Sequence, residues 1–376
     1  MRVVYTAFEG RYSDSPRALY ERLRHLRPKA QHTWLCDPLH AAGFPADVRT
    51  VSHDGRKAIT ALETADLIVS NTHIELDWVK KPGATYLQTW HGTPLKRIHN
   101  DVLWAPEGRL AYLDRDVERW DYLLSPNHVS TPRLRDAFGF TGEVLEVGYP
   151  RNDVLSSPDA PAIRARVRAA LGIPDDVTAV LYTPTWRDNE YWADGTPDVS
   201  LALDVDAFVE TLGPKQWLLP RLHYMVTSRS EALDRDGVVD VSWYPDVHEL
   251  YLAADVMITD YSSTMFDFAI TGKPMLFYAY DLESYRDSLR GFYFDFQPLA
   301  PGPVLETSAE VIDALQHLDE VTEAYRERYA TFQELFTHLD DGHATDRLRW
   351  LFAKHHRRPQ LSPWPLTAVP EPSGSA

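Results

Sequence analysis

The chain has 376 residues, which at about 150 residues per domain suggests two domains. Hydrophobic residues make up 44% and charged residues 25%, a composition that excludes a disordered, collagenous or disulfide-stapled protein. The formal net charge of −17 argues against general nucleic-acid binding, which needs a basic surface, and restricts phosphate binding to a local site.

The sequence favours the cytoplasm. The single cysteine, Cys36, has no partner for an internal disulfide and is expected to be a buried apolar residue. The first residues lack the pattern of a signal peptide, and no run of about 18 uncharged apolar residues predicts a transmembrane helix. We therefore expect a cytoplasmic protein whose contact with the membrane, if any, is peripheral and at its inner face.

Short apolar runs alternate with amphipathic helices through the first half of the chain. A strand at 3–5 precedes a helix that begins at Ser15 and places Leu19, Leu23 and Leu26 on one face. Further strands are predicted at 33–35, 67–69, 85–87 and 122–124. Alternation of this kind predicts a parallel sheet with helices on both faces.

The same pattern restarts in the second half. Residues 156–161, rich in Ser and Pro, indicate a linker, and a helix over 163–171 ends at Gly172. Strands are then predicted at 179–182, 217–219, 238–241, 256–259 and 274–278. The acidic helical segment 309–351 closes the second unit or packs back on the first. We expect an N-terminal domain over 1–155, a C-terminal domain over 156–356 and a disordered tail over 357–376.

The segment 88–96 follows a predicted strand and is the first that can carry chemistry. In open α/β sheets, ligands bind where loops leave the carboxyl ends of the strands. His91 is followed by Gly92, which leaves room for a substrate beside the ring, and Thr93 and Lys96 lie close by. A histidine pKa of about 6.5 suits a general base. The structural alternative is a capping or core histidine.

Two further segments follow predicted strands and carry cationic groups. In 181–188, two threonines and Arg187 suit phosphate oxygens, and a turn in which Arg187 pairs with Asp188 is the alternative. In 220–224, Arg221 and His223 alternate, so extended backbone places both on one side, where they can bind an anion. A surface pair without a ligand is the alternative there.

A fourth segment, 258–267, ends a buried strand at Asp260 and starts a helix with Ser262, Ser263 and Thr264. The free N–H groups and the positive dipole of a helix N-terminus bind phosphate, and hydroxyls add donors. Ser262 or Ser263 can also be a simple N-cap. The two roles are compatible, because a cap can face a ligand.

Other chemistries find no support in the sequence. The Walker A, G-x-G-x-x-G and G-x-S-x-G patterns are absent. No H-E-x-x-H or cysteine cluster indicates a metal site, and we expect no cofactor. The sequence leaves open whether a divalent ion assists.

Together these segments resemble the CDP-glycerol glycerophosphotransferase family, the polymerases and primases of teichoic acids and related capsule polymers. The resemblance covers nearly the whole chain and is most specific in the string Gln-Thr-Trp-His-Gly-Thr-Pro-Leu-Lys at 88–96. The chain lacks the long extra N-terminal regions of some polymerases and resembles the transferase core alone. The matching segments are 12–20, 88–96, 148–153, 182–188, 255–273 and 290–295.

The resemblance implies a GT-B fold, in which two Rossmann-like domains face each other across a cleft. It implies that the N-terminal domain binds the acceptor, that the C-terminal domain binds the nucleotide donor, and that the active-site histidines are His91 and His223. The residues expected around the donor pyrophosphate are Arg187, Arg221, Arg229, Ser262, Ser263 and Thr264. The loop expected to hold the base and ribose contains Tyr244, Pro245 and Asp246, with a structural turn as the alternative. The acceptor side is expected at Gly92, Thr93 and Lys96.

The activity that the resemblance implies is transfer of glycerol phosphate, or a related alditol phosphate, to an acceptor hydroxyl with release of CMP. The expected partners are CDP-glycerol or another CDP-alditol and a lipid-linked or polymeric acceptor. Two alternatives stay open: a GT-B glycosyltransferase with a nucleotide-sugar donor in cell-surface polysaccharide synthesis, and an inactive scaffold that binds nucleotide or polymer. The presence of both His91 and His223 argues against the scaffold.

Two basic stretches are candidates for contact with an anionic membrane or a polyanionic acceptor. Residues 11–29 carry six Arg and Lys side chains against Asp14 and Glu21. Lys354, Arg357 and Arg358 form the second stretch. An exposed helix face is the structural alternative.

Overall fold

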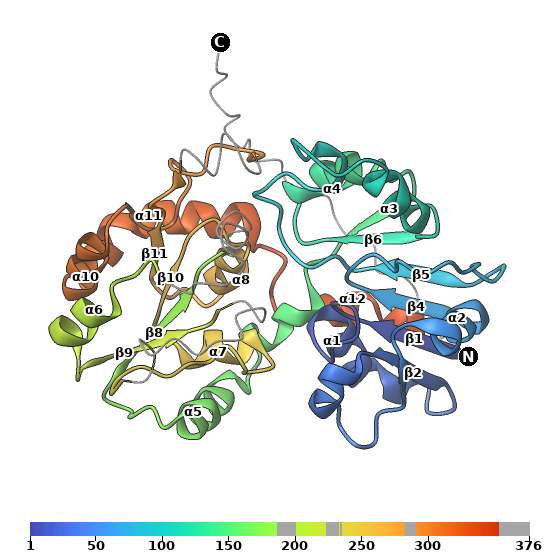
Figure 1. The fold of residues 1–376 in the computed structure, drawn as a ribbon, viewed down its shortest axis with the longest axis horizontal. Helices are drawn as coiled ribbons and strands as arrows, with labels where there is room; N and C mark the ends of the chain where they lie inside the picture. Colours follow the sequence, from blue (N-terminus) through green and yellow to red (C-terminus); the bar gives the residue numbers. More distant parts are fainter. Residues whose placement is uncertain (186–200, 223–232, 234, 283–290, 353–376) are drawn as a thin grey trace, which may run out of the picture. The chain divides into compact units, whose positions relative to one another are not determined.

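The computed structural model describes residues 1–185, 201–222, 233, 235–282 and 291–352 (Figure 1). The chain divides into two compact units, each with its own β-sheet. Unit 1 consists of Met1–Ser157 and resumes at Leu335, and unit 2 consists of Pro158–Glu334.

Unit 1 is built around a seven-stranded parallel sheet with the strand order β3-β2-β1-β4-β5-β6-β7. The strands are β1 (Arg2–Thr6), β2 (Gln31–Cys36), β3 (Thr50–Ser52), β4 (Leu67–Ser70), β5 (Thr85–Gln88), β6 (Tyr122–Ser125) and β7 (Glu143–Glu146). Strand β1 pairs with β2 on one side and with β4 on the other, so the strand order reverses between β1 and β4. Ligands of open α/β sheets bind at the carboxyl ends of the strands at such a reversal.

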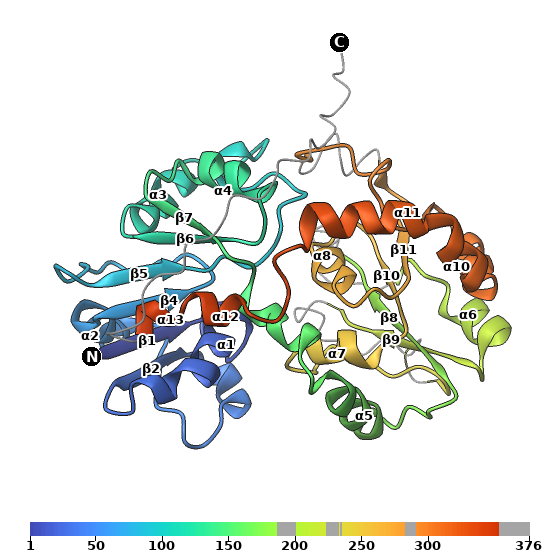
Figure 2. The ribbon, with the colours of Figure 1, turned by 180° about the vertical axis from the view of Figure 1, so that it is seen from behind.

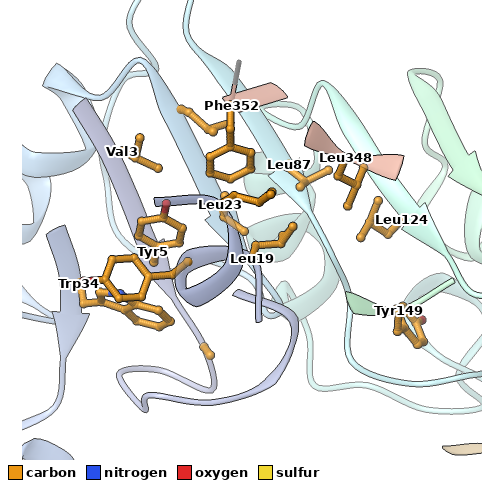
Figure 3. Packing of buried hydrophobic residues seen from close by; sticks show 14 of the residues in the cluster. Val3, Tyr5, Leu19, Leu23, Trp34, Leu87, Leu124, Tyr149, Leu348 and Phe352 are labelled. Carbon is orange, nitrogen blue, oxygen red and sulfur yellow. The ribbon is translucent and has the colours of Figure 1, made fainter. Parts of the chain in front are cut away.

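Helices cover both faces of this sheet. They include α1 (Asp14–Leu23), α2 (Gly55–Thr64), α3 (Arg109–Val117) and α4 (Ser130–Phe138), with the 3₁₀-helices η1 (Arg24–Leu26), η2 (Pro38–Gly43), η3 (His99–Asp101) and η4 (Pro150–Ser156). On β1, Val3 and Tyr5 belong to a buried cluster that contains Leu19 of α1 (Figure 3). Val4, between them, belongs to a second cluster that contains Leu62 of α2. The two clusters differ because successive side chains of a strand point to opposite faces.

The last described helices, α12 (Ala344–Arg347) and α13 (Arg349–Phe352), pack on unit 1. The carboxylate of Asp153 in η4 accepts the N–H groups of Ala344 and Thr345, each at 2.9 Å. Phe352 joins the cluster that contains Leu19 (Figure 3), and Figure 2 shows both helices on the side of the sheet that α1 covers. The segment 309–351 thus does both things that were considered for it: its residues up to Glu334 belong to unit 2, and those from Leu335 on pack on unit 1, within the range 156–356 predicted for the second domain.

The described residues of unit 2 form a five-stranded parallel sheet with the order β12-β11-β10-β8-β9. Its strands are β8 (Thr178–Thr183), β9 (Gln216–Pro220), β10 (Val256–Thr259), β11 (Met275–Tyr278) and β12 (Val304–Leu305). Its helices are α5 (Ala160–Leu171), α6 (Val205–Leu212), α7 (Val247–Ala253), α8 (Thr264–Ala269), α10 (Ser308–Gln316) and α11 (Leu318–Phe336). The strand order reverses between β8 and β10, which pair directly. Unit 2 therefore has the same kind of strand-order reversal as unit 1.

The predicted parallel α/β architecture is confirmed, and most predicted strands are present. The strand predicted at 238–241 is present in part: Val238 forms a parallel bridge with Leu218, and the N–H groups of Val239 and Val241 donate to the carbonyl oxygens of Leu218 and Pro220, each at 2.9 Å. A turn follows at 242–243, and the carboxylate of Asp240 accepts the N–H of Ser242 at 2.9 Å. Short strands such as β3 and β12 were not predicted, since two or three residues carry too weak a pattern.

The first helix is shorter than predicted. α1 ends at Leu23, and Leu26 lies in η1 rather than on the helix face. Pro28 explains why η1 ends at Leu26, because proline disfavours helical backbone at the residue before it, here Arg27. Arg27 indeed leaves the helical region, with φ of −137° and ψ of 66°.

Candidate active site

His91 follows the carboxyl end of β5 in unit 1. The side-chain oxygen of Gln88, the last strand residue, accepts the N–H of Trp90 at 2.9 Å. Trp90 has φ of +52°, a left-handed conformation that is rare for a bulky residue and clusters at functional sites. This turn brings the ring of His91 to the neighbouring strand end, where it contacts the backbone of Asn71, the residue after β4.

One hydrogen bond fixes the tautomer of His91. Nδ1 lies 2.6 Å from the carbonyl oxygen of Asn71. Because a carbonyl oxygen only accepts, Nδ1 carries the proton and Nε2 keeps its lone pair. Among the described residues, Nε2 has no hydrogen-bond partner. Burial lowers the pKa of His91, although the Asn71 carbonyl and the charge of Asp14 oppose the shift. The ring is therefore neutral and can accept a proton at Nε2, as a general base must.

A buried ion pair lies within electrostatic reach of this histidine. Nη1 of Arg151 lies 2.7 Å from Oδ2 of Asp14, and the two side chains are 5% and 6% exposed. The Asp14 charge raises and the Arg151 charge lowers the pKa of His91. The pair joins the start of α1 to η4. Both segments carry the family resemblance, but the sequence analysis predicted no role for Asp14 or Arg151.

The predicted acceptor-side residues come directly after His91. Gly92 and Thr93 are buried, and Lys96 is half-buried. The carbonyl oxygen of Gly92 accepts the hydroxyl of Tyr149 at 3.1 Å, and Tyr149 is itself part of the core in Figure 3. The core thus anchors the segment that follows His91. Contact of these residues with an acceptor stays a prediction.

In unit 2, hydrogen bonds join the carboxyl ends of β8 and β10. Asp260, the residue after β10, accepts the N–H and the hydroxyl of Thr185 at 2.9 and 2.6 Å. The hydroxyl of Thr259 donates to the carbonyl oxygen of Thr183 at 2.9 Å. These contacts fix the start of the loop after β8 at the reversal of the strand order.

The hydroxyls predicted to bind pyrophosphate lie at the start of α8, and all three residues are half-buried. Ser263 is the N-cap, and its side chain makes no capping hydrogen bond. Ser262 Oγ accepts the N–H of Thr264 at 3.4 Å. The Thr264 hydroxyl lies 3.3 Å from that of Thr183, so the structure brings these residues to the same sheet edge.

Arg221 supports the loop predicted to hold the nucleotide base. Its Nη1 donates to the carbonyl oxygens of Val241 and Tyr244 at 3.1 and 2.7 Å. Asp246, at the end of the loop, caps α7 by accepting the N–H of His248 at 2.9 Å. Arg221 and Asp246 thus shape this loop. Direct contact with a nucleotide stays a prediction for Arg221, Tyr244, Pro245 and Asp246.

Sequence patterns missed the charged cluster around His248. Its Nδ1 lies 3.3 Å from Asp246, and its Nε2 lies 3.7 Å from Asp267 on α8. Burial alone would lower the pKa of His248, but hydrogen bonds and charges from the two carboxylates outweigh it and raise the pKa to about 9. The protonated ring links the base loop to α8. The spacing of Asp246 and His248 was visible in the sequence, but Asp267 comes from another helix.

Three predicted site residues, Arg187, His223 and Arg229, lie outside the described residues. Their roles stay predictions. In the part of the chain that the structure describes, no group of three or more His, Cys, Asp and Glu side chains is arranged to hold a metal ion. Within the same residues, no helix has both the length and the apolarity needed to cross a membrane.

The family comparison bears on both units. A family model described as CDP-glycerol:poly(glycerophosphate) glycerophosphotransferase matches residues 1–352. The chain belongs to this family. The resemblance inferred from the motifs is therefore confirmed, and it extends over the His91 segment in unit 1 and the hydroxyl-rich sheet edge in unit 2.

Two curated relatives differ in length. The teichoic acid glycerol-phosphate transferase of Staphylococcus aureus is 40% identical over 358 residues, which are 92% of this chain and 91% of that protein. The teichoic acid poly(glycerol phosphate) polymerase of Bacillus subtilis is 37% identical over 358 residues, which are 92% of this chain and 48% of that polymerase. The chain thus spans nearly all of the first relative and about half of the second.

Solved structures give the same fold. A structure of the wall teichoic acid polymerase TagF, in which a histidine is replaced by asparagine and CDPG was soaked in, matches with a TM-score of 0.86 at 36% identity. The match covers 93% of this chain and 88% of that chain. The predicted GT-B class, with two Rossmann-like units on parallel sheets, is confirmed.

Proposed function

We propose that the chain transfers glycerol phosphate from CDP-glycerol to an acceptor hydroxyl, with release of CMP, in teichoic acid synthesis. The observation that carries the proposal is the hydrogen bond between His91 and Asn71, which leaves Nε2 of a neutral ring available to take a proton. This base lies in the most specific motif of a chain that belongs to the glycerophosphotransferase family. The names of the relatives support glycerol phosphate as the transferred unit.

In the proposed reaction, the acceptor hydroxyl attacks the β-phosphorus of CDP-glycerol. Its proton moves to Nε2 of His91 as the new oxygen–phosphorus bond forms. The bond between the β-phosphorus and the bridging oxygen breaks, and that oxygen leaves with the electron pair as part of CMP. The product is a phosphodiester. Such reactions depend mainly on positioning and on stabilisation of charge.

The donor side of the proposal rests on unit 2. The hydroxyls of Ser262, Ser263 and Thr264 and the N–H groups at the start of α8 suit the oxygens of a pyrophosphate. The loop that Arg221 supports suits the base and ribose, through Tyr244, Pro245 and Asp246. From their motifs alone, His223 is proposed as the second active-site histidine, and Arg187 and Arg229 as further pyrophosphate ligands.

The acceptor side of the proposal rests on unit 1, with Gly92, Thr93 and Lys96 beside the base. A lipid-linked or polymeric acceptor fits a cytoplasmic enzyme that touches the inner face of the membrane, and this location is part of the proposal. Three arginines of the stretch 11–29 are paired within unit 1: Arg17 with Glu21, Arg22 with Asp346 and Arg24 with Asp47. These pairings favour an exposed helix face over a membrane-binding strip for that stretch.

The experiment that tests the proposal is CMP release from CDP-glycerol with an acceptor that ends in glycerol phosphate, followed by phosphorus NMR of the product. We expect one new phosphodiester for each CMP released. A glycosidic product from a nucleotide sugar would replace the proposal with the glycosyltransferase alternative. Nucleotide binding without turnover would replace it with the scaffold. A parallel reaction with CDP-ribitol decides which alditol is preferred.

A further inference from the structure

The side chain of Tyr149 ties the backbone that follows His91 to the core of unit 1. Tyr149 is 0% exposed and lies in the buried cluster of Figure 3. Its hydroxyl donates to the carbonyl oxygen of Gly92, the residue after His91, at 3.1 Å. A buried polar group that loses its partner costs free energy, so the hydroxyl and this carbonyl stay together. The backbone directly after His91 is therefore held in place.

His91 is thus fixed at two points. The Asn71 carbonyl lies 2.6 Å from Nδ1 of the ring, and Tyr149 holds the main chain of the next residue. The first contact limits rotation of the ring, and the second limits movement of the backbone that carries it. Together they set the direction in which Nε2 points. That direction matters, because a general base must lie within about 2.6–3.2 Å of the group whose proton it takes.

Arg151 contacts both Tyr149 and Asp14. Its guanidinium carbon lies 4.6 Å from the centroid of the Tyr149 ring, a cation–π contact. Its Nη1 donates to Oδ2 of Asp14 at 2.7 Å. Oδ1 of the same carboxylate accepts the N–H of Ser15 at 2.6 Å. One cation therefore bridges the residue that holds Gly92 and the first residue of α1.

Stability alone does not account for this arrangement. Asp14 and Arg151 are 6% and 5% exposed, and the attraction between two buried charges often fails to repay the cost of removing them from water. Asp14 also has φ of +60°, a left-handed conformation that costs free energy in a non-glycine residue. Strain of this kind clusters at active sites. The functional group within reach is His91, whose pKa both charges affect.

We propose that Tyr149 and Arg151 are positioning residues for His91. Tyr149 holds the backbone of Gly92, and Arg151 holds Tyr149. This inference rests on the proposed function, in which His91 is the base. Loss of either contact lets Nε2 take up directions from which it does not reach the acceptor hydroxyl. The chemical step then slows, while the donor-binding residues of unit 2 are unchanged.

The first test is Tyr149→Phe, which removes the hydroxyl alone. At a temperature at which urea titrations show the variant fully folded, kcat falls about tenfold to hundredfold, as a small misplacement of a reacting group predicts. The KM for CDP-glycerol is unchanged. The acid limb of kcat/KM stays at the wild-type pH, because no charge has been removed. A role in stability alone would lower the midpoint of the urea titration and leave kcat as it is.

The matched control is Tyr329→Phe on α11. The hydroxyl of Tyr329 donates to the carbonyl oxygen of Lys273 at 2.8 Å, so this variant also removes a tyrosine hydroxyl from a backbone carbonyl. Lys273 precedes β11 and lies at the amino ends of the strands of unit 2, away from the edge at which open α/β sheets bind ligands. We expect kcat and both KM values of this variant to equal those of the wild type.

The second test is Arg151→Lys, which keeps a positive charge for Asp14 but lacks the planar group over the Tyr149 ring. It lowers kcat in the wild type and lowers it less in Tyr149→Phe, because the contact through which it acts is already lost. The proposal is overturned if folded Tyr149→Phe keeps the wild-type kcat, or if the losses from the two substitutions are additive. Absence of CMP release by the wild type with every acceptor overturns the proposed function itself.

Discussion

The carbonyl oxygen of Asn71 and Nδ1 of His91 lie 2.6 Å apart, and this contact decides which ring nitrogen can act as a base. The two residues come from neighbouring strand ends, β4 and β5, so the sheet itself sets the distance. With Nδ1 committed as a donor, Nε2 is the proton acceptor.

Replacement of His91 by alanine removes the proposed base and leaves unit 2 intact. We expect kcat to fall by about 10²–10⁴-fold, the usual contribution of a general base. The affinity for CDP-glycerol, measured by calorimetry, should be unchanged. His91→Gln is the matched control, because its amide can still donate to the Asn71 carbonyl but cannot take a proton. Near-normal CMP release by His91→Gln would show that the His91 ring positions the substrate and does not take its proton.

The pH dependence of kcat/KM reports the protonation of His91. Burial lowers the pKa of this residue, so the acid limb should lie below the ordinary histidine value of about 6.5. Asp14→Asn removes a carboxylate that raises this pKa and should move the limb to still lower pH. A limb above about 6.5, or movement in the opposite direction, would contradict the assignment.

The buried pair of Asp14 and Arg151 should matter for stability. Arg151→Met leaves the Asp14 carboxylate buried without its counter-ion and should reduce the free energy of unfolding by about 3–5 kcal/mol in urea titrations. The double variant Asp14→Asn/Arg151→Met removes both charges and should recover part of that loss. Equal losses in the single and double variants would contradict this, because they would mean that the Asp14 carboxylate costs nothing when it is buried without its counter-ion.

His248 predicts a pH-dependent contribution to stability. Its pKa is raised to about 9 in the folded protein, above its unfolded value of about 6.5, so the stabilisation is complete below pH 6.5 and is lost as the pH rises through about 9. We expect His248→Gln to lose about 2 kcal/mol of unfolding free energy at about pH 6 and close to nothing at about pH 10. A loss that is the same at both pH values would argue against a charged ring.

Ser263→Ala tests the donor side. The side chain makes no capping hydrogen bond, so the melting temperature should be unchanged. If the hydroxyl binds a charged phosphate oxygen, the KM for CDP-glycerol should rise about tenfold. The KM for the acceptor serves as the internal control. An unchanged donor KM would remove this hydroxyl from the pyrophosphate site.

Local patterns in the sequence were sufficient for the architecture and for the position of His91 at the end of a strand. Successive side chains of β1 enter two different hydrophobic clusters, one on each face of the sheet. A strand that is buried on both faces needs apolar residues at every position, so its apolar run predicts a sheet covered on both sides. His91 was predictable because chemistry-bearing side chains follow the carboxyl ends of parallel strands. The family string at 88–96 narrowed that prediction to one reaction class.

The residues around His91 could not be predicted from local patterns. Asn71 lies 20 residues before His91 and acts through its backbone carbonyl, which every residue has. Arg151 and Asp14 are 137 residues apart, and only the folded sheet brings them together. The same holds for His248 and Asp267, which come from different helices. One sequence signal was available for Asn71, as for Asp260: each is a polar residue directly after a buried strand.

The most direct test of the central claim is the ratio of CMP released to phosphodiester formed, measured for the wild type and for His91→Gln with CDP-glycerol and an acceptor that ends in glycerol phosphate. The account predicts one phosphodiester for each CMP in the wild type and a rate at least about 100-fold lower in the variant. CMP release without phosphodiester formation, or equal rates in the two proteins, would contradict it.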